Sequence, residues 1–255
     1  MRPNKIKQMW RDKKFVTMGW LSVSHGFTAE VMARQGFDTL CVDMQHGTTS
    51  MSEVWPMLQA ISQTDTVPVV RVPWNDPATI MKALDLGAYG IIVPLINTAE
   101  EAAKAVAACR YPPVGMRSSG PVRAVHYGGS DYVAKANDEI VIMAMIETKE
   151  GIANLDAICA TPGLDAVYIG PADLSFALGL PPGPDKSDAI HMATCDKIRD
   201  AAHKHGIKAV MHCASAAFAA GAVKRGFDMV MLTSDLASMV AGARRQLDDL
   251  KAATA

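Results

Sequence analysis

Several features are absent from the 255-residue sequence, and each absence excludes a class of protein. No stretch approaches the ~18 consecutive apolar residues of a membrane-spanning helix. The opening residues, MRPNK, lack the apolar core of a signal peptide. The formal net charge is −1 and the basic residues are scattered, so neither nucleic acid nor a membrane surface is an expected partner. We therefore expect a soluble, cytoplasmic protein.

The cysteines also lack a recognisable pattern. They are five in number, and no two of them form a C-x-x-C pair, so neither a disulfide framework nor a zinc knuckle is indicated. Aromatic residues make up only 6%, but 49% of the chain is apolar, which supplies a packed interior and argues against disorder. The cysteines are Cys41, Cys109, Cys159, Cys195 and Cys213.

Short apolar runs alternate with longer amphipathic segments along the whole chain. The runs are nearly continuous in apolar residues, as strands covered on both faces of a parallel sheet are. Eight of them in β/α order, in a chain near the ~250 residues of a TIM barrel, predict one (β/α)₈-barrel domain over residues 1–255. No G-x-G-x-x-G follows the first run, which disfavours a dinucleotide-binding fold. The predicted strands are Val16–Leu21, Thr39–Asp43, Val67–Val72, Gly90–Pro94, Ile140–Ile146, Ala166–Ile169, Lys208–His212 and Met229–Leu232.

Local signals mark where helices begin and end. A glycine followed by an apolar residue precedes five of the strands, as expected for left-handed helix C-caps. Thr98 with Glu101 has the pattern of a capping box. The five glycines are Gly36, Gly87, Gly163, Gly206 and Gly226.

Three segments break this rhythm. Residues 110–138 are rich in Gly, Pro and Arg with little periodicity, and residues 180–186 (LPPGPDK) form a proline-rich loop after the sixth strand. Loops of this kind are commonly lids or subunit contacts. The last helix, around Leu236–Ala252, has an apolar face with few local partners, and we expect it to pack across a subunit boundary.

Polar residues cluster at the carboxyl ends of the predicted strands, which is the end of a TIM barrel that carries catalytic groups. Asp43 ends the second strand and His46 follows it, Arg71 lies at the end of the third, Glu147 follows the fifth and Asp173 follows the sixth. We expect the histidine, the arginine and the two carboxylates Glu147 and Asp173 to converge on one mouth of the barrel from four different strands.

The two acids Glu147 and Asp173 are candidate metal ligands. Carboxylates without cysteine or paired histidine make a hard oxygen site suited to Mg²⁺, Mn²⁺ or Co²⁺. A 2-oxo acid can complete such a site through its carboxylate and keto oxygens. Position alone allows a plainer interpretation, in which Glu147 caps the next helix and Asp173 holds a turn.

Arg71 and His46 are candidate catalytic groups with plainer alternatives. A guanidinium in an otherwise apolar strand needs an acceptor, either a substrate oxygen or a structural partner such as Asp43 or Asp76. His46 can carry protons near neutral pH, although a single histidine at a strand end is more often structural. Asp85 lies in a predicted helix and by itself reads as an ordinary exposed carboxylate.

Five segments in order resemble the HpcH/HpaI family of class II pyruvate aldolases. The resemblance implies a modified TIM barrel, a divalent metal, and a homo-oligomer, usually a hexamer built as a trimer of dimers that exchange the terminal helix. Its substrates are a small 2-oxo acid and an aldehyde. The segments are VVRVPWND, LDLGAYGIIVPLINTAEEA, RYPPVGMR, IETKEGIANLDAI and VYIGPADLS.

By this resemblance Glu147 and Asp173 hold the metal and Arg71 stabilises the enolate and the aldehyde oxygen. His46 acts as acid/base together with Asp85 of a neighbouring subunit. The substrate site is implied to include Trp20, Asp43 and the backbone of Gly170, Pro171 and Ala172.

Two departures from the family pattern concern the choice of substrate. The second strand ends in Asp43-Met44-Gln45-His46, where well-known members resemble D-G-E-H. Met145 stands where a glutamine usually precedes the metal glutamate by two residues. The donor substrate could therefore be pyruvate or a related 2-oxo acid such as hydroxypyruvate.

The function predicted from these observations is an aldehyde-lyase that cleaves 4-hydroxy-2-oxo acids to a 2-oxo acid and an aldehyde. A Schiff-base aldolase is disfavoured because Lys149 and Lys208 are poorly placed for a barrel interior. A CoA-ester lyase of the citrate lyase β type and a non-catalytic 2-oxo acid-binding barrel are the alternatives.

Overall fold

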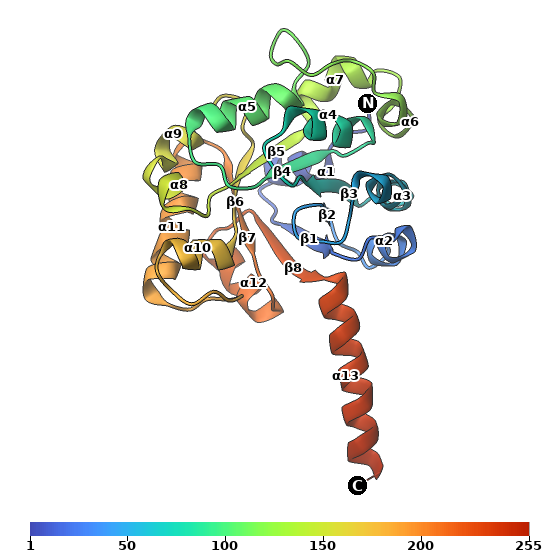
Figure 1. The fold of residues 1–255 in the computed structure, drawn as a ribbon, viewed down its shortest axis with the longest axis vertical. Helices are drawn as coiled ribbons and strands as arrows, with labels where there is room; N and C mark the ends of the chain where they lie inside the picture. The colour runs from blue at the N-terminus through green and yellow to red at the C-terminus, as the bar shows by residue number, and fades with distance from the viewer. Residues whose placement is uncertain (255) are drawn as a thin grey trace.

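The computed structural model describes residues 1–254, and its centre is a closed barrel of eight parallel strands in chain order (Figure 1). All eight predicted strands are confirmed. The largest differences are at β5, which is one residue shorter at each end, and at β8, which continues to Ser234. The strands are β1 (Val16–Leu21), β2 (Thr39–Asp43), β3 (Val67–Arg71), β4 (Gly90–Val93), β5 (Val141–Met145), β6 (Ala166–Ile169), β7 (Lys208–His212) and β8 (Met229–Ser234).

Helices surround the barrel and cover the outward faces of the strands (Figure 1). With apolar residues both inside the barrel and under the helices, β2 to β6 are buried at every position. The helices are α1 (Lys5–Arg11), α2 (Gly26–Ala33), α3 (Met51–Ile61), α4 (Pro77–Asp85), α5 (Ala99–Cys109), α6 (Val122–Gly128), α7 (Tyr132–Glu139), α8 (Lys149–Ala153), α9 (Leu155–Cys159), α10 (Pro171–Ala177), α11 (Ala189–Lys204), α12 (Ala216–Lys224) and α13 (Asp235–Thr254).

The predicted helix-end signals are largely confirmed. All five glycines that precede strands have positive φ, between 74° and 101°, a region that L-residues with a Cβ rarely occupy. Thr98 caps α5 by accepting a hydrogen bond from the backbone N–H of Glu101. The return bond of the capping box differs, because the Glu101 carboxylate accepts from Asn97 N–H at 2.7 Å.

The expectation for residues 110–138 is wrong in part, because α6 lies within this segment and most of α7 does as well. The segment connects α5 to the start of β5, which places it at the amino-terminal end of the barrel. A lid from this segment over the carboxyl-terminal mouth of the same barrel is therefore excluded. Residues 180–186 form an irregular loop, as predicted.

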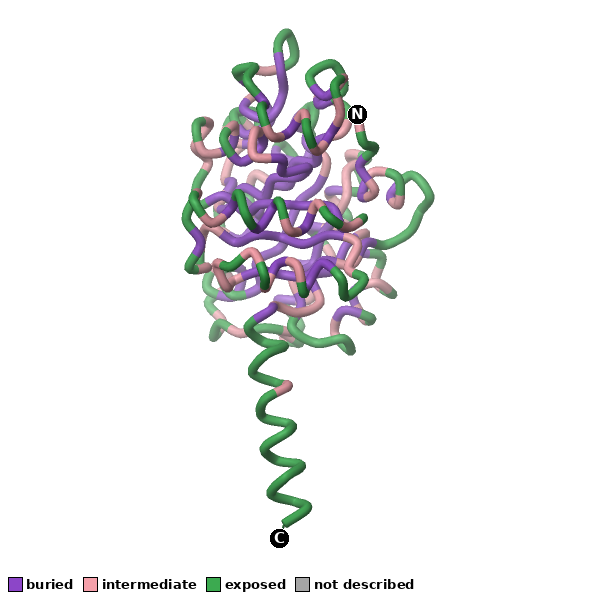
Figure 2. The backbone as a smooth tube through the Cα atoms, turned by 90° about the vertical axis from the view of Figure 1, so that its right-hand side faces the viewer, coloured by how far each residue is buried: buried purple, intermediate pink, exposed green. Residues whose placement is uncertain are grey.

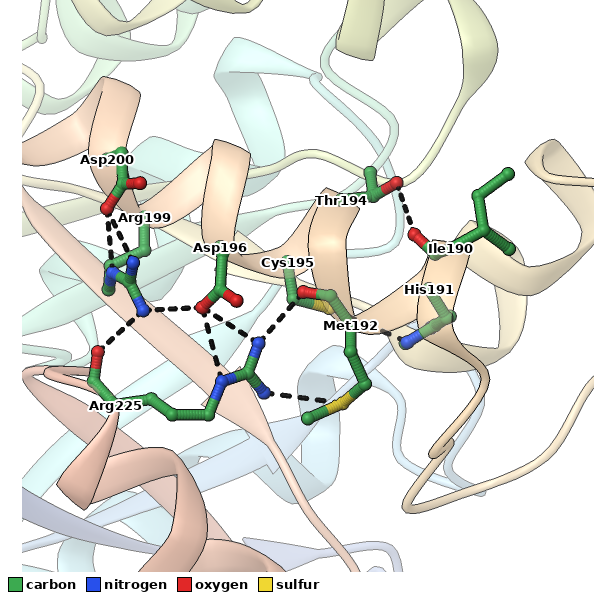
Figure 3. A network of polar contacts seen from close by, with 9 residues as sticks. All are labelled: Ile190, His191, Met192, Thr194, Cys195, Asp196, Arg199, Asp200 and Arg225. Atoms are coloured by element: carbon green, nitrogen blue, oxygen red, sulfur yellow. Dashed lines mark hydrogen bonds and ion pairs between the residues drawn. The ribbon is translucent and has the colours of Figure 1, made fainter.

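A network of arginines and aspartates fastens α11 to the end of α12 (Figure 3). Asp196 of α11 forms ion pairs with both Arg199 and Arg225. Arg225 also donates to the Met192 carbonyl at 2.8 Å. At the first turn of α11, the buried His191 lies 3.3 Å from the Pro171 carbonyl oxygen, so the same helix supports the turn that follows β6.

The C-terminal helix α13 leaves the barrel and projects away from it (Figures 1 and 2). Asp235 is its one buried residue among those described, and its carboxylate accepts the backbone N–H groups of Ser22 and Val23 at 3.0 Å. Beyond this anchor the helix is exposed along nearly its whole length (Figure 2). None of the helices in residues 1–254 combines the length and the apolar character needed to cross a membrane.

Candidate active site

A cavity of about 530 Å³ opens at the carboxyl-terminal end of the barrel. Four polar residues predicted from the strand ends, His46, Arg71, Glu147 and Asp173, line it together with the backbone of residues 170–172. The proline-rich loop contributes residues 182–184 to the rim. The convergence predicted from strand order is therefore observed for these four side chains.

Arg71 is held in place by a buried carboxylate on the neighbouring strand. Asp43 and Arg71 are register partners at the ends of β2 and β3. The two Asp43 oxygens accept from Arg71 Nε at 2.8 Å and from Nη2 at 2.6 Å, and Trp20 Nε1 donates to Asp43 at 3.2 Å. The hydrogen bonds and positive charge from Arg71 outweigh burial and hold the pKa of Asp43 below its usual value.

This arrangement leaves part of the Arg71 guanidinium free to bind a ligand. No protein acceptor among the described residues contacts Nη1, and the guanidinium carbon lies 4.7 Å from the centre of the Trp20 ring. Asp43 itself does not line the cavity, so it lies behind Arg71 as a positioning group. Arg71 can therefore pair with Asp43 and still bind a ligand, so the two alternatives predicted for it do not exclude each other.

Glu147 is a buried carboxylate with an unused oxygen. Its side chain is 2% exposed, and Oε1 accepts the backbone N–H of Leu95 at 3.0 Å. Oε2 is buried and lacks a hydrogen-bond partner among the described residues. Burial, assisted by the negative charge of Asp173, raises the pKa of Glu147 to about 7. An orphaned acceptor of this kind needs a cation or a proton.

The two acids fit a divalent metal that is completed by other ligands. Residues 1–254 contain no group of three or more His, Cys, Asp or Glu side chains arranged around a common point. A metal held by Glu147 and Asp173 therefore keeps open positions for water or substrate, as hard oxygen sites commonly do. Asp173 is exposed to the cavity in the first turn of α10, with its carboxylate available.

Asp85 is not near this cavity in its own chain. It ends α4, which places it at the amino-terminal end of the barrel, where its carboxylate accepts from Arg117 Nη2 at 2.8 Å. Arg117, which is 1% exposed, also donates to the Tyr132 hydroxyl at 3.1 Å. Both hydrogen-bond partners of Arg117 therefore lie within its own chain.

One polar residue of the cavity, His212, was not among the predicted site residues. His212 ends β7 and lines both the main cavity and a second cavity of about 300 Å³ beside it. Its Nδ1 lies 2.7 Å from the hydroxyl of the buried Tyr168 on β6. The rule that selected the other strand-end residues also applies to β7, so this histidine was within reach of the sequence.

Comparisons with known proteins identify the family of the chain. Residues 16–242 match the family model described as HpcH/HpaI aldolase/citrate lyase. The chain belongs to this family. A hydroxypyruvate/pyruvate aldolase from Rhizorhabdus wittichii is 41% identical over 249 residues, covering 98% of this chain and 99% of the relative.

Two further family comparisons cover most of the barrel. A 5-keto-4-deoxy-D-glucarate aldolase from Escherichia coli is 41% identical over 179 residues, which is 69% of this chain and 70% of the relative. A crystal structure of a family protein from Burkholderia cenocepacia superposes with a TM-score of 0.91 at 30% identity, covering 97% of this chain and 99% of that chain. The barrel is therefore that of a family described as aldolases and citrate lyases.

Proposed function

We propose that the protein is a metal-dependent aldolase that reversibly cleaves 4-hydroxy-2-oxo acids to pyruvate, or a related 2-oxo acid such as hydroxypyruvate, and an aldehyde. The observation that carries this proposal is the orphaned oxygen of Glu147, which lies in one cavity with Asp173, Arg71 and His46. Both curated relatives described above are named as aldolases.

The residues divide the binding of the 2-oxo acid between them. Glu147 and Asp173 hold the divalent metal, which when bound supplies Lewis-acid stabilisation of negative charge on the keto oxygen. Arg71 lines the cavity, and its Nη1 has no acceptor among the described residues, so its fixed positive charge is available to stabilise the same developing charge. The backbone N–H groups of Ala172 and Asp173 precede the first intrahelical bond of α10, from Leu174 N to Gly170 O, and we infer that they bind the substrate carboxylate.

His46 is the group that moves the proton. Its imidazole borders the cavity, on the segment that follows β2. In the cleavage direction it accepts the proton of the 4-hydroxyl, directly or through water, as the bond between C3 and C4 breaks and the aldehyde leaves. The same proton returns to the aldehyde oxygen in condensation.

The cavity lining favours this chemistry over a Schiff base. No lysine lines the main cavity or its neighbour among residues 1–254. Lys208 at the start of β7 pairs with Asp228 at 3.0 Å, and Lys149 begins α8 beyond the end of β5. Trapping with borohydride in the presence of pyruvate is therefore expected to leave the protein mass unchanged.

The decisive experiment follows exchange of the pyruvate methyl protons in D₂O by NMR, with and without Mn²⁺. We expect exchange only when metal is present, and Arg71→Ala and Glu147→Gln to abolish it while the circular dichroism spectrum is unchanged. Exchange that survives exhaustive chelation contradicts the metal role. An assay of malyl-CoA beside a 4-hydroxy-2-oxo acid separates the aldolase from a CoA-ester lyase.

We further propose that the active unit is an oligomer, a hexamer built from dimers that exchange α13. Exposed apolar residues recur on one face of this helix, with exposed fractions between 43 and 61%. A groove of about 710 Å³ beside its start is lined by Phe27, Val31 and Phe37 of the α2 region, which suits the apolar face of a second copy. The exposed apolar residues are Leu236, Met239, Val240, Leu247 and Leu250.

A shared active site explains the position of Asp85, which lies away from the cavity of its own barrel. Co-expression of Arg71→Ala and Asp85→Asn chains with different affinity tags tests this. Each variant alone is expected to be nearly inactive, whereas mixed oligomers regain about a quarter of the wild-type activity, because one site in four combines intact groups from two chains. Mixed oligomers without recovered activity contradict a shared site.

A further inference from the structure

His212 lies in the wall between two adjoining cavities. The main cavity contains the residues proposed to hold the metal, and the second cavity, of about 300 Å³, lies among the ends of β1, β7 and β8 and the start of α13. Arg71 and His212 are the two residues that line both. A substrate bound at Glu147 and Asp173 therefore reaches the second cavity past these two side chains.

The second cavity is lined partly by polar groups. Ser22 follows β1, and Thr233 and Ser234 end β8, so three hydroxyl-bearing residues lie around it. The remaining wall includes Trp20, whose ring meets the His212 ring edge-on at a centroid distance of 5.1 Å. Such a lining suits a short hydroxylated chain better than a purely apolar one.

The hydrogen bond to Tyr168 determines which nitrogen of His212 carries the proton. The Tyr168 side chain is fully buried, and His212 Nδ1, at 2.7 Å, is the one hydrogen-bond partner of its hydroxyl among residues 1–254. If Nδ1 carried the proton, the buried hydroxyl hydrogen of Tyr168 would have no acceptor, which is costly. The Tyr168 hydroxyl therefore donates to Nδ1, and the proton of the neutral imidazole is on Nε2.

The free Nε2–H is available to a ligand. It has no protein partner in the described part of the chain, and it is not among the buried polar atoms without a partner. Burial, assisted by the positive charge of Arg71, lowers the pKa of His212 to about 4. Burial likewise raises the pKa of Tyr168, so that its hydroxyl keeps its proton.

We propose that His212 is a specificity-determining residue whose Nε2–H donates a hydrogen bond to a hydroxyl of the substrate. This hydroxyl is carried by a carbon of the bond that is made or broken, or by the carbon next to it. The second cavity receives that hydroxylated end of the substrate. This inference rests on the proposed aldol reaction. Two sources share the chemistry: the 3-hydroxyl of a hydroxypyruvate-type donor and the hydroxyl of a hydroxyaldehyde acceptor.

The test compares four substrate pairs, pyruvate or hydroxypyruvate with acetaldehyde or glycolaldehyde, for the wild type, His212→Leu, His212→Gln and Tyr168→Phe. We expect His212→Leu to lower kcat/KM for the hydroxylated partner about tenfold relative to its deoxy counterpart, the effect of one hydrogen bond. The glutamine variant keeps an N–H donor and is expected to retain most of the preference. Tyr168→Phe removes the hydroxyl that keeps the His212 proton on Nε2, so that either ring nitrogen can carry it. We expect this variant to lose part of the preference for the hydroxylated partner.

The outcomes separate the inference from the proposed function. If His212→Leu lowers the kcat/KM of hydroxypyruvate relative to pyruvate, the hydroxyl belongs to the 2-oxo acid. If it lowers the kcat/KM of glycolaldehyde relative to acetaldehyde, the hydroxyl belongs to the aldehyde. Equal losses for all four pairs in His212→Leu would overturn the specificity role while leaving the aldolase intact. If the wild type forms no aldol product at all, calorimetric titration with Mn²⁺ and either 2-oxo acid still tests the donor arm. Wild-type binding without preference for hydroxypyruvate then overturns the donor arm, and the acceptor arm has already failed together with the proposed function because no aldol product forms.

Discussion

A Cβ atom on Gly170 would lie 2.1 Å from Glu147 Oε2, far inside van der Waals contact. The backbone of Gly170 has φ −89° and ψ 103°, values that any residue adopts, so glycine is needed there for space rather than for conformation. The turn after β6 thus leaves room for the Glu147 carboxylate, which follows the neighbouring strand β5. The missing side chain at Gly170 therefore allows Glu147 to occupy its place in the cavity.

Gly170→Ala is expected to displace the Glu147 carboxylate and weaken Mn²⁺ binding at least tenfold, while the barrel stays folded. Titration calorimetry measures the affinity and thermal unfolding measures the fold. Gly221→Ala is the matched control, because its added Cβ meets no atom within 4 Å. Unchanged metal affinity in Gly170→Ala would show that Glu147 does not bind the ion.

Asp43→Asn removes the charge that holds Arg71 but keeps the size of the side chain. We expect kcat/KM to fall about 100-fold, because a misplaced guanidinium no longer meets the developing charge. The free energy of unfolding is expected to fall by about 3 kcal/mol, since Arg71 is left as a buried charge without its partner. Urea denaturation and steady-state kinetics measure the two effects.

Glu30→Gln provides the comparison for this buried pair. It breaks the exposed ion pair with Arg34, whose atoms are 3.3 Å apart, and it is expected to change neither stability nor turnover appreciably. Equal effects of Asp43→Asn and Glu30→Gln would contradict the positioning role of Asp43.

The lowered pKa of His212 predicts a pH dependence of stability. The unfolded chain binds a proton at this residue near pH 6.5, whereas the folded chain binds it only near a pKa of about 4. The contribution of the neutral imidazole is therefore complete above pH 6.5 and is lost as the pH falls from about 6.5 to 4. His212→Gln cannot titrate, so its unfolding free energy should decline less over this range. If the unfolding free energies of the two proteins fall in parallel between pH 7 and 4.5, the lowered pKa of His212 is excluded.

Met239→Glu tests the exposed apolar face of α13. A charge in this position, where Met239 is 50% exposed in the single chain, should weaken assembly and shift the protein toward smaller species in light scattering. Arg245→Gln changes the net charge by the same amount on the opposite side of the helix and is expected to leave assembly intact. Dissociation in both variants would indicate a general charge effect instead of an apolar interface.

The residues of the main cavity could be predicted from local sequence because strand order determines their common end. In a parallel barrel all carboxyl ends face one way, so residues after β2, β3, β5 and β6 must meet once the strands are recognised. Apolar runs located those strands, and glycines with positive φ marked the preceding helix ends. Arg71, Glu147 and Asp173 were found in this way.

The local sequence determined the elements of this protein and the end of the barrel at which its polar residues lie, because hydrophobic period and helix caps are properties of neighbouring residues. Only the tertiary structure decided which side chains pair with one another. The hydrogen bond between Tyr168 and His212 depends on the pairing of β6 with β7, two strands that are far apart in the sequence. Likewise Arg117 reaches Asp85 across 32 residues, since a long side chain selects its acceptor only after the elements have packed.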